Sequence, residues 1–532
     1  MENILVEYVY LILIILGLVV IANRLGLAYP IVLLIGGLVV STIPFFQNIT
    51  ITPELVFLIF LPPLLYEAAW QISWKEFWKW RRIIAGFAFP IVIITSCVIA
   101  LISSSLIPGF TLAIGFLLGG IISPPDSISS VTIMKQTKAP KSAISVAEGE
   151  SLLNDASSLI VFRFALAAVI TGQFNLQEAT FSFVWVVIAG SFIGLAVGLV
   201  FYGIHSWLPL TPSIEIVLTF VTPYCMYYLA EHFHVSGVLA VVCGGLLLSS
   251  KRQSLLSYAS RIQGVNVWNS IVFILNGLIF LLIGLQLPSI INQLGDISLK
   301  SAILYGILIS LALIVTRIII TLFTSGFTRI MSNFIEVSEV NPGWKIPLVL
   351  GWAGIRGVVS LAAALSIPLY TIGETPFPYR NLILFITFIV ILTTMIFNGL
   401  TLPWLIRKLN VMDFQTPIPV HRQEVMIQKK LATESLHYLE EKNKTGARKN
   451  KHLKNLISRL KTELGYFEEE LKGMSGTHRG ERKEYGDVYL ELLQFQRDVL
   501  NDLNHDSGFD EEVIRKYHAL IDIEEFKTRE SD

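Results

Sequence analysis

Charged residues are scarce in this 532-residue sequence, at 15% against roughly a quarter in an ordinary soluble protein. Cysteine is also rare, and the three cysteines lie far apart in apolar stretches without CxxC spacing. Hydrophobic residues make up 53%, and the mean hydropathy is +0.64. These features exclude a disordered protein, a disulfide scaffold and a typical cytosolic enzyme. The balance of 40 basic and 40 acidic residues excludes a generally basic nucleic-acid-binding protein.

The charges that are present divide the chain into two unlike regions. Residues 1–411 contain 20 basic and 16 acidic side chains, whereas the much shorter region 412–532 contains 20 basic and 24 acidic ones. This contrast predicts a transmembrane domain at 1–411 and a soluble helical tail at 412–532. Apolar residues at helical spacing predict three or four tail helices packed as a small bundle. Because this helical tail has no site motif, we expect it to regulate or stabilise the protein, with a regulatory ligand or protein partner.

Hydrophobic runs predict an all-α polytopic membrane protein with about 13 transmembrane helices, or 12 if one short run is re-entrant. The first run lacks a basic flank and a cleavage site, so we interpret it as a retained helix. The 13 expected spans are residues 4–22, 27–43, 53–70, 83–107, 110–134, 143–171, 179–204, 213–231, 235–250, 268–288, 300–323, 346–370 and 380–406.

Basic residues in the connecting loops predict the orientation of these spans. With the tail assumed to be cytoplasmic, the inside loops hold 15 basic residues and the outside loops hold only Lys300 and Arg380. This asymmetry predicts a multi-pass protein of the plasma (bacterial inner) membrane, with its N-terminus outside and its C-terminus in the cytoplasm. The segment Trp70–Arg82 contains four tryptophans and four basic residues, which favours a helix lying among lipid headgroups.

Ionisable residues within the expected spans are the candidate functional residues, because burying a charge in a membrane is costly. The span 143–171 is the most polar of the expected spans. It places Glu150, Asn154 and Ser157 near one face and Ser151, Asp155 and Ser158 one step round the helix. The full set of intramembrane charges is Glu67, Asp126, Glu148, Glu150, Asp155, Arg163, Glu215, Arg317 and Arg356.

Two of the expected spans contain helix-breaking residues. Residues 123–126 read Ser-Pro-Pro-Asp, and residues 351–357 contain three glycines around Arg356. Non-helical backbone inside a membrane is tolerated only around a cavity or a buried site, where freed carbonyls can bind a small cation. Two such breaks in the two halves of the domain predict crossed discontinuous helices from inverted repeats. Close packing of a glycine-rich helix is the alternative, but it does not explain the arginine.

Charge balance limits the mechanism. Glu150 is the expected partner of Arg317 in a structural ion pair, and Arg356 is expected to offset half-helix dipoles, which leaves Asp155 free. Burial favours the protonated form of a carboxyl group, and a nearby cation favours the ionised form. A carboxylate in this position holds either a proton or a monovalent cation, and this competition is the chemical basis of an exchanger.

Four motifs in order resemble the monovalent cation:proton antiporter-1 family, the sodium/proton exchangers, over roughly residues 1–410. They are LPPLLYEAA at 61–69, the break at 123–126, GESLLNDASSLIVFRFALA at 149–167 and GWAGIRGVVSLAAAL at 351–365. The resemblance implies a homodimer, with a dimerisation domain and a six-helix core that contains the broken helices and moves like an elevator. It implies transported Na+ (or Li+) and H+ and no cofactor.

The resemblance also implies roles for individual residues. Asp155 matches the aspartate that binds Na+ and the proton, and Asn154 marks the electroneutral type. Ser151 matches a hydroxyl ligand and Glu67 an acid near the site, while Arg356 matches the arginine of the second broken helix. Glu150 and Arg317 match a stabilising ion pair.

The first break departs from the Thr-Asp-Pro pattern of many relatives. Ser123 stands in place of the threonine, Pro124 in place of the aspartate, and Asp126 follows two residues later. Asp126 therefore either contacts the ion or caps the following half-helix. Potassium/proton or broader cation/proton exchange is the near alternative function. A cation channel and an intramembrane enzyme are the remote ones, and no HExxH, Ser-His or GxGD arrangement supports an enzyme.

Overall fold

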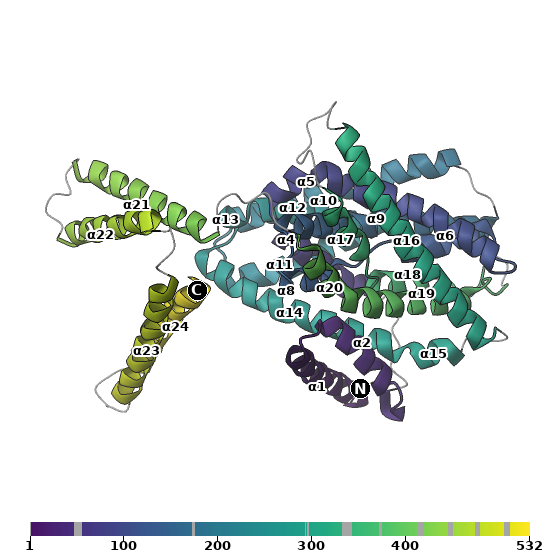
Figure 1. The fold of residues 1–532 in the computed structure, drawn as a ribbon, viewed down its shortest axis with the longest axis horizontal. Helices are drawn as coiled ribbons and strands as arrows, with labels where there is room; N and C mark the ends of the chain where they lie inside the picture. Colours follow the sequence, from purple (N-terminus) through teal and green to yellow (C-terminus); the bar gives the residue numbers. More distant parts are fainter. Residues whose placement is uncertain are drawn as a thin grey trace. The chain divides into compact units, whose positions relative to one another are not determined.

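The computed structural model describes residues 2–46, 56–172, 176–292, 294, 297–331, 343–371, 375–411, 420–444, 451–473, 479–504 and 511–531. Within these residues every regular element is a helix, and one isolated bridge joins Tyr370 to Pro376. The predicted all-α class is therefore confirmed. The chain divides into two compact units, Met1–Asp413 and Phe414–Asp532. Figure 1 shows the helices of both units.

The first unit contains helices of very different lengths. Its first part has α1 (Glu2–Leu25), α2 (Tyr29–Val40), η1 (Pro44–Phe46), η2 (Val56–Phe60), α4 (Leu61–Gln71), α5 (Trp74–Gly86), η3 (Phe87–Ile91), α6 (Val92–Leu106), α7 (Leu112–Ile122), α8 (Ser127–Gln136) and α9 (Lys141–Thr171). Its second part has α10 (Leu176–Trp207), α11 (Pro212–His232), α12 (Gly237–Ser250), α13 (Arg252–Leu255), α14 (Tyr258–Leu285), α15 (Leu287–Asn292), α16 (Leu299–Met331), α17 (Lys345–Trp352), α18 (Val358–Leu365), α19 (Arg380–Thr393), η4 (Thr394–Asn398) and α20 (Gly399–Leu409).

Seven helical stretches in the described residues are long and apolar enough to cross a membrane, which makes this a multi-pass membrane protein. They are Trp74–Leu106, Lys141–Thr171, Phe181–Trp207, Pro212–His232, Tyr258–Asn292, Leu299–Gly326 and Arg380–Leu409. The other six expected spans correspond to shorter or interrupted helices, such as α2, α12 and the pair α7 and α8. The expected total of 13 spans stays a prediction.

The tryptophan-rich segment Trp70–Arg82 does not form one helix of its own. Residues 74–82 are instead the first turns of the continuous helical stretch Trp74–Leu106. Ser73 starts this stretch as its N-cap, accepting a hydrogen bond from the Glu76 amide at 3.5 Å. A π-helical turn, η3, carries the helix past Pro90 without ending it. The expected position of this helix among lipid headgroups stays a prediction.

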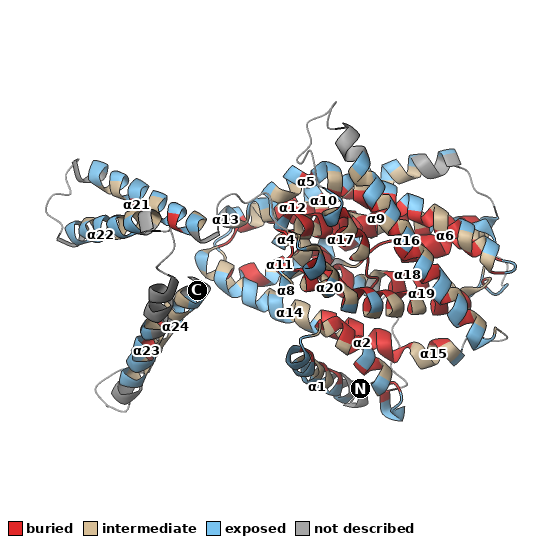
Figure 2. Ribbon diagram, in the orientation of Figure 1, coloured by how far each residue is buried: buried red, intermediate tan, exposed pale blue. Residues whose placement is uncertain are grey.

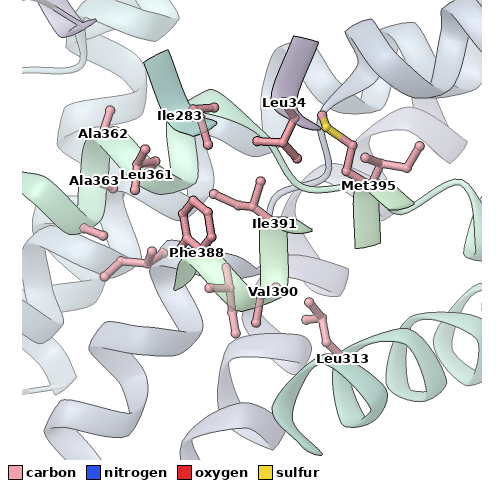
Figure 3. Packing of buried hydrophobic residues seen from close by; sticks show 14 of the residues in the cluster. Leu34, Ile283, Leu313, Leu361, Ala362, Ala363, Phe388, Val390, Ile391 and Met395 are labelled. Atoms are coloured by element: carbon pink, nitrogen blue, oxygen red, sulfur yellow. The ribbon is translucent and has the colours of Figure 1, made fainter. Parts of the chain in front are cut away.

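Two hydrophobic cores hold the first unit together. One contains residues of α2, α7, α14, α18 and α19, and Figure 3 shows part of it, with Phe388 and Ile391 of α19 near Leu361 of α18 and Ile283 of α14. The other contains residues of α4, α11 and α12. Helix α9 contributes Phe162 to the first core and both Leu152 and Ala156 to the second. The segment around Asp155 therefore lies where the two cores meet, and Figure 2 shows buried residues gathered around α9, α17 and α18.

Four helices form the described residues of the second unit. They are α21 (Val420–Lys444), α22 (Lys451–Gly473), α23 (Arg479–Asn504) and α24 (Glu511–Ser531). Helix α21 packs on α22, and the ion pair between Lys429 and Glu468 joins them at 3.0 Å. Helix α23 packs on α24, and Arg497 contacts Asp522 at 2.7 Å. The expected turn at 473–480 lies largely outside the described residues.

A candidate ion-binding site between two interrupted helices

The first interruption lies between α7 and α8. Pro124 and Pro125 carry no amide hydrogen, so α7 ends at Ile122 and a new helix begins at Ser127. Asp126 is the N-cap of α8: its Oδ1 accepts from the Ile128 amide at 3.0 Å, and its Oδ2 accepts from Ser129 Oγ at 3.2 Å. The structure thus gives Asp126 the capping position that the sequence analysis left open.

The second interruption lies between α17 and α18, and it contacts the first directly. The Asp126 amide donates to the carbonyl oxygen of Ile355 at 2.7 Å. Gly357, the N-cap residue of α18, lies so close to Asp126 that a Cβ atom there would come within 2.6 Å of Asp126 Oδ2. The Asp126 carboxylate is therefore placed at the positive N-terminal ends of two half-helices, α8 and α18.

Arg356 lies at the C-terminal ends of α7 and α17, the half-helices that precede the two interruptions. Its side chain is 1% exposed, and its Nε donates to the carbonyl oxygen of Ile122, the last residue of α7, at 2.6 Å. Its Nη1 donates to the carbonyl oxygen of Gly354, just beyond α17. Its amide donates at 3.0 Å to Thr394 Oγ1 in the π-helical turn η4. A buried cation thus faces the negative C-terminal ends of α7 and α17, in keeping with the expected dipole compensation.

Helix α9 carries two buried carboxylates with different surroundings. Glu150 is 2% exposed, and Arg317 Nη2 of α16 lies 2.8 Å from its Oε1 and donates to its Oε2 at 2.9 Å. The structure brings together the pair that the sequence analysis expects. Asp155 is 8% exposed and has no ion-pair partner among the described residues. Of the two carboxylates, only Asp155 is without a neutralising arginine.

Asp155 lines a cavity of about 60 Å³. Ser151 and Leu152 lie beside it on α9, and Pro124, Pro125 and Asp126 come from the first interruption. Gly357 and Ser360 come from the second, and Leu61, Leu64 and Leu65 of α4 form an apolar wall. This arrangement combines carboxylates, hydroxyls and helix ends around one small volume, which are groups that replace the water shell of a monovalent cation.

Three of the expected site residues do not line this cavity. Ser123 is buried beneath the break, where its Oγ accepts from Ser96 Oγ at 3.3 Å. Glu67 lies on α4 and accepts a hydrogen bond from Gln71. Asn154 is fully buried, and neither its Oδ1 nor its Nδ2 has a hydrogen-bond partner among the described residues.

The structure also shows an ion pair that the sequence analysis missed. Arg163 Nη2 of α9 contacts both carboxylate oxygens of Glu231 at 2.9 Å, and the amide of Gly237 donates to Glu231 Oε1 at 3.2 Å. Glu231 lies near the end of α11 and Gly237 begins α12, so the pair ties α9 to the turn between them. Arg163 was among the candidates, but no local pattern indicates a partner 68 residues away.

A multi-pass helical protein whose two interrupted helices meet beside buried charges has the architecture of an ion transporter. A family model described as "Sodium/hydrogen exchanger, transmembrane" matches residues 10–408. The chain therefore belongs to this family of transporters, and the resemblance found in the sequence is confirmed.

Individual relatives agree with this assignment, and a solved structure has a similar fold. The "Sodium, potassium, lithium and rubidium/H(+) antiporter" of Bacillus pumilus is 34% identical over 382 residues, which are 70% of this chain and 56% of the relative. The E. coli "Uncharacterized Na(+)/H(+) exchanger YjcE" is 30% identical and matched over 74% of each chain. The sodium proton antiporter MjNhaP1 of Methanocaldococcus jannaschii has a similar fold, with a TM-score of 0.61 at 17% identity, over 76% of this chain and 99% of that one. The chain spans less than two thirds of the length of the Bacillus relatives it matches.

Proposed function

We propose that the protein exchanges a monovalent cation, Na+ or Li+, for a proton at Asp155. One observation carries this proposal: of two carboxylates buried on α9, Glu150 is neutralised by Arg317 and Asp155 is not. An unneutralised buried carboxylate binds either a proton or a cation, so the two compete for one site. Competition at a site reached alternately from each side is sufficient for antiport.

The neighbouring residues support this assignment. Ser151 lines the cavity one turn before Asp155, and Asp126 contributes from the first break. Ser123 and Glu67 lie outside the cavity and act as more distant members of the site. Asn154 carries no charge, so Asp155 alone exchanges one proton for one cation, and transport is electroneutral. No cofactor takes part in this scheme.

The two hydrophobic cores support an elevator-type alternating-access mechanism. In this mechanism the interrupted helices cross, and they move together with α9 against helices α4, α11 and α12. The working protein is a homodimer in the bacterial inner membrane, surrounded by lipid, with its N-terminus outside and its C-terminus in the cytoplasm. The unit 414–532 is a regulatory domain that binds a ligand or protein. The physiological role is pH and sodium homeostasis.

Broader cation use is the second candidate function. The Bacillus relatives carry names that include potassium and rubidium besides sodium and lithium. A site built from carboxylates, hydroxyls and helix ends imposes little selection by charge among monovalent cations. Exchange of K+ for H+ is therefore the alternative.

The test is transport by the purified full-length protein in proteoliposomes containing a pH-sensitive dye, with Na+, Li+ or K+ added outside. We expect cation-driven proton movement that does not change with an imposed voltage. Asp155→Asn should abolish it and leave protein yield unchanged, while Asp498→Asn on the exposed face of α23 serves as the matched control. Proton movement retained by Asp155→Asn would refute the site, and voltage-dependent rates would refute electroneutrality.

A further inference from the structure

The junction between α4 and α5 gathers tryptophans and basic residues from three segments. Trp70 lies in the last turn of α4, Trp74 and Trp78 lie on α5, and Arg252 begins α13. The Arg252 guanidinium lies 5.9 Å from the Trp70 ring centre, and Ser249 of α12 donates to the Trp70 carbonyl oxygen at 2.9 Å. We name this group, together with Lys75 and Arg81, the α4–α5 junction cluster.

The aromatic part of the cluster is exposed. Trp74 and Trp78 are stacked, with ring centres 5.7 Å apart and an interplanar angle of 22°, yet they are 44% and 54% exposed. Arg81 lies over the Trp78 ring at 4.5 Å. Stacked, exposed indoles beside cations are suited to the boundary between lipid headgroups and acyl chains.

The cationic part of the cluster lacks acidic partners. Among the described residues, Lys75, Arg81 and Arg252 form no ion pair. Glu76, the single acid in α5, accepts a hydrogen bond from Trp80 Nε1 at 3.1 Å. Within the part of the chain that the structure describes, the cluster therefore carries a net positive charge that no acidic side chain neutralises. Guanidinium and ammonium groups in this state are the groups that bind phosphate.

We propose that the α4–α5 junction cluster binds the phosphate headgroup of an anionic phospholipid. Lys75 and Arg252 contact the phosphate, and the Trp74–Trp78 stack contacts the upper acyl chain. The site is separate from the cavity at Asp155, and the proposal does not depend on which ion is transported.

The position of the cluster gives the lipid a structural role. Helix α4 forms the apolar wall of the cavity, and α5 packs on α9, where Ile84 fills the space beside Gly149. The two helices are joined by the short link at Ile72 and Ser73. A lipid held at this link by α5 and α13 stabilises the attachment of the cavity wall to the helix that carries Asp155.

The test is native mass spectrometry of the detergent-purified full-length protein with equal amounts of phosphatidylglycerol and phosphatidylcholine. We expect preferential retention of phosphatidylglycerol. Lys75→Gln/Arg252→Gln should lower that retention by roughly tenfold or more, since each basic residue near an anionic lipid contributes substantially to binding. Lys300→Gln/Lys430→Gln, which removes the same charge elsewhere, should leave it unchanged.

Several outcomes would overturn the proposal. Equal retention of the two lipids would mean non-specific interfacial contact, and an equal loss in both double variants would mean a general charge effect. Displacement of phosphatidylglycerol by millimolar inorganic phosphate would mean a free-anion site. If the double variant folds poorly, Lys75→Gln alone, at an exposed position, should still reduce retention. Unchanged retention in that variant would also contradict the site.

Discussion

The guanidinium of Arg356 donates to the carbonyl oxygen of Ile122. A side chain of the second interruption therefore caps the helix that precedes the first interruption. Ile122 is the last residue of α7, where helical carbonyl groups have no helical partner. Together with the bond to Gly354, this places one buried cation on two helix C-termini. The two interrupted helices are therefore joined by charge as well as by packing.

Replacing Arg356 should separate the contribution of its charge from the contribution of its packing. Arg356→Gln removes the charge from two helix ends, and a buried cation at a helix C-terminus contributes up to about 2 kcal/mol. We expect a lower thermal unfolding temperature in detergent, measured by intrinsic fluorescence, and a loss of exchange. Arg356→Lys should recover part of the stability because it keeps the charge but not the two-carbonyl geometry. Arg24→Gln, at an exposed position in α1, is the control. Equal stability of Arg356→Gln and Arg24→Gln would contradict the dipole interpretation.

The ion pair between Glu150 and Arg317 predicts a pattern of non-additive stability. Arg317→Met leaves Glu150 as an uncompensated buried charge, which costs about 3–5 kcal/mol. Glu150→Gln/Arg317→Met removes both charges and should unfold at a higher temperature than Arg317→Met alone. A double variant less stable than either single variant would show that the two residues act independently.

Gly357 predicts a steric effect that does not involve charge. A Cβ atom at this position would lie 2.6 Å from Asp126 Oδ2, so Gly357→Ala should push the two interruptions apart and reduce exchange strongly. Adding Asp126→Ala should restore part of the thermal stability, because the colliding carboxylate is gone. Gly17→Ala in α1 is the matched control, since its Cβ meets nothing within 4 Å. Equal thermal stability and exchange in Gly357→Ala and Gly17→Ala would show that the contact between Gly357 and Asp126 does not affect either property.

The ion pair between Arg163 and Glu231 can be tested by charge reversal. Arg163→Glu and Glu231→Arg each place like charges together and should lower both thermal stability and the exchange rate. The double reversal restores opposite charges and should recover most of the loss. The tail pair Lys429 and Glu468 has similar exposure, and its reversal should not change exchange. Failure of the double variant to improve on either single variant would exclude a direct interaction.

The hairpin of α23 and α24 should weaken in acid. Hydrogen bonds from Arg529 and then Arg497 lower the pKa of Glu525 below its ordinary value of 4.5. Because the folded pKa is lowered, the stabilisation is fully present above about pH 4.5 and is lost as the pH falls through the folded pKa. Amide hydrogen exchange in these helices, corrected for the intrinsic pH effect, should accelerate below pH 4.5 in the full-length protein. Glu525→Gln should remove this additional acceleration, and an unchanged acid response in that variant would contradict the assignment.

Sequence patterns predicted those parts of the site that depend on unusual local residues. Proline pairs and closely spaced glycines identified both interruptions, and the shortage of buried charges left Glu150 as the natural partner of Arg317. Family membership followed from the same motifs. Each of these residues carries a free-energy cost inside a membrane unless a specific structural role offsets it.

Contacts between segments that are far apart in the chain could not be predicted from local sequence patterns. The Glu231 partner of Arg163, the Ile122 carbonyl that receives Arg356 and the close approach of Gly357 to Asp126 all join segments far apart in sequence. Glu67 belongs to a matching motif, yet it lies outside the cavity because α4 presents leucines to it instead. The long helix beginning at Trp74 was missed because tryptophans and basic residues suit either a surface helix or the end of a spanning one.

The bond between Arg356 and Ile122 joins residues separated by 234 positions, and this separation has a consequence for biosynthesis. A ribosome that adds roughly 5–20 residues per second needs about 10 to 50 seconds to travel between them. During that interval the nascent chain holds the open end of α7 without the guanidinium that later covers it. Water or the insertion machinery must solvate these carbonyl groups until the second interruption is synthesised. The first half of this transporter is therefore synthesised before the arginine that completes the interaction at the end of α7.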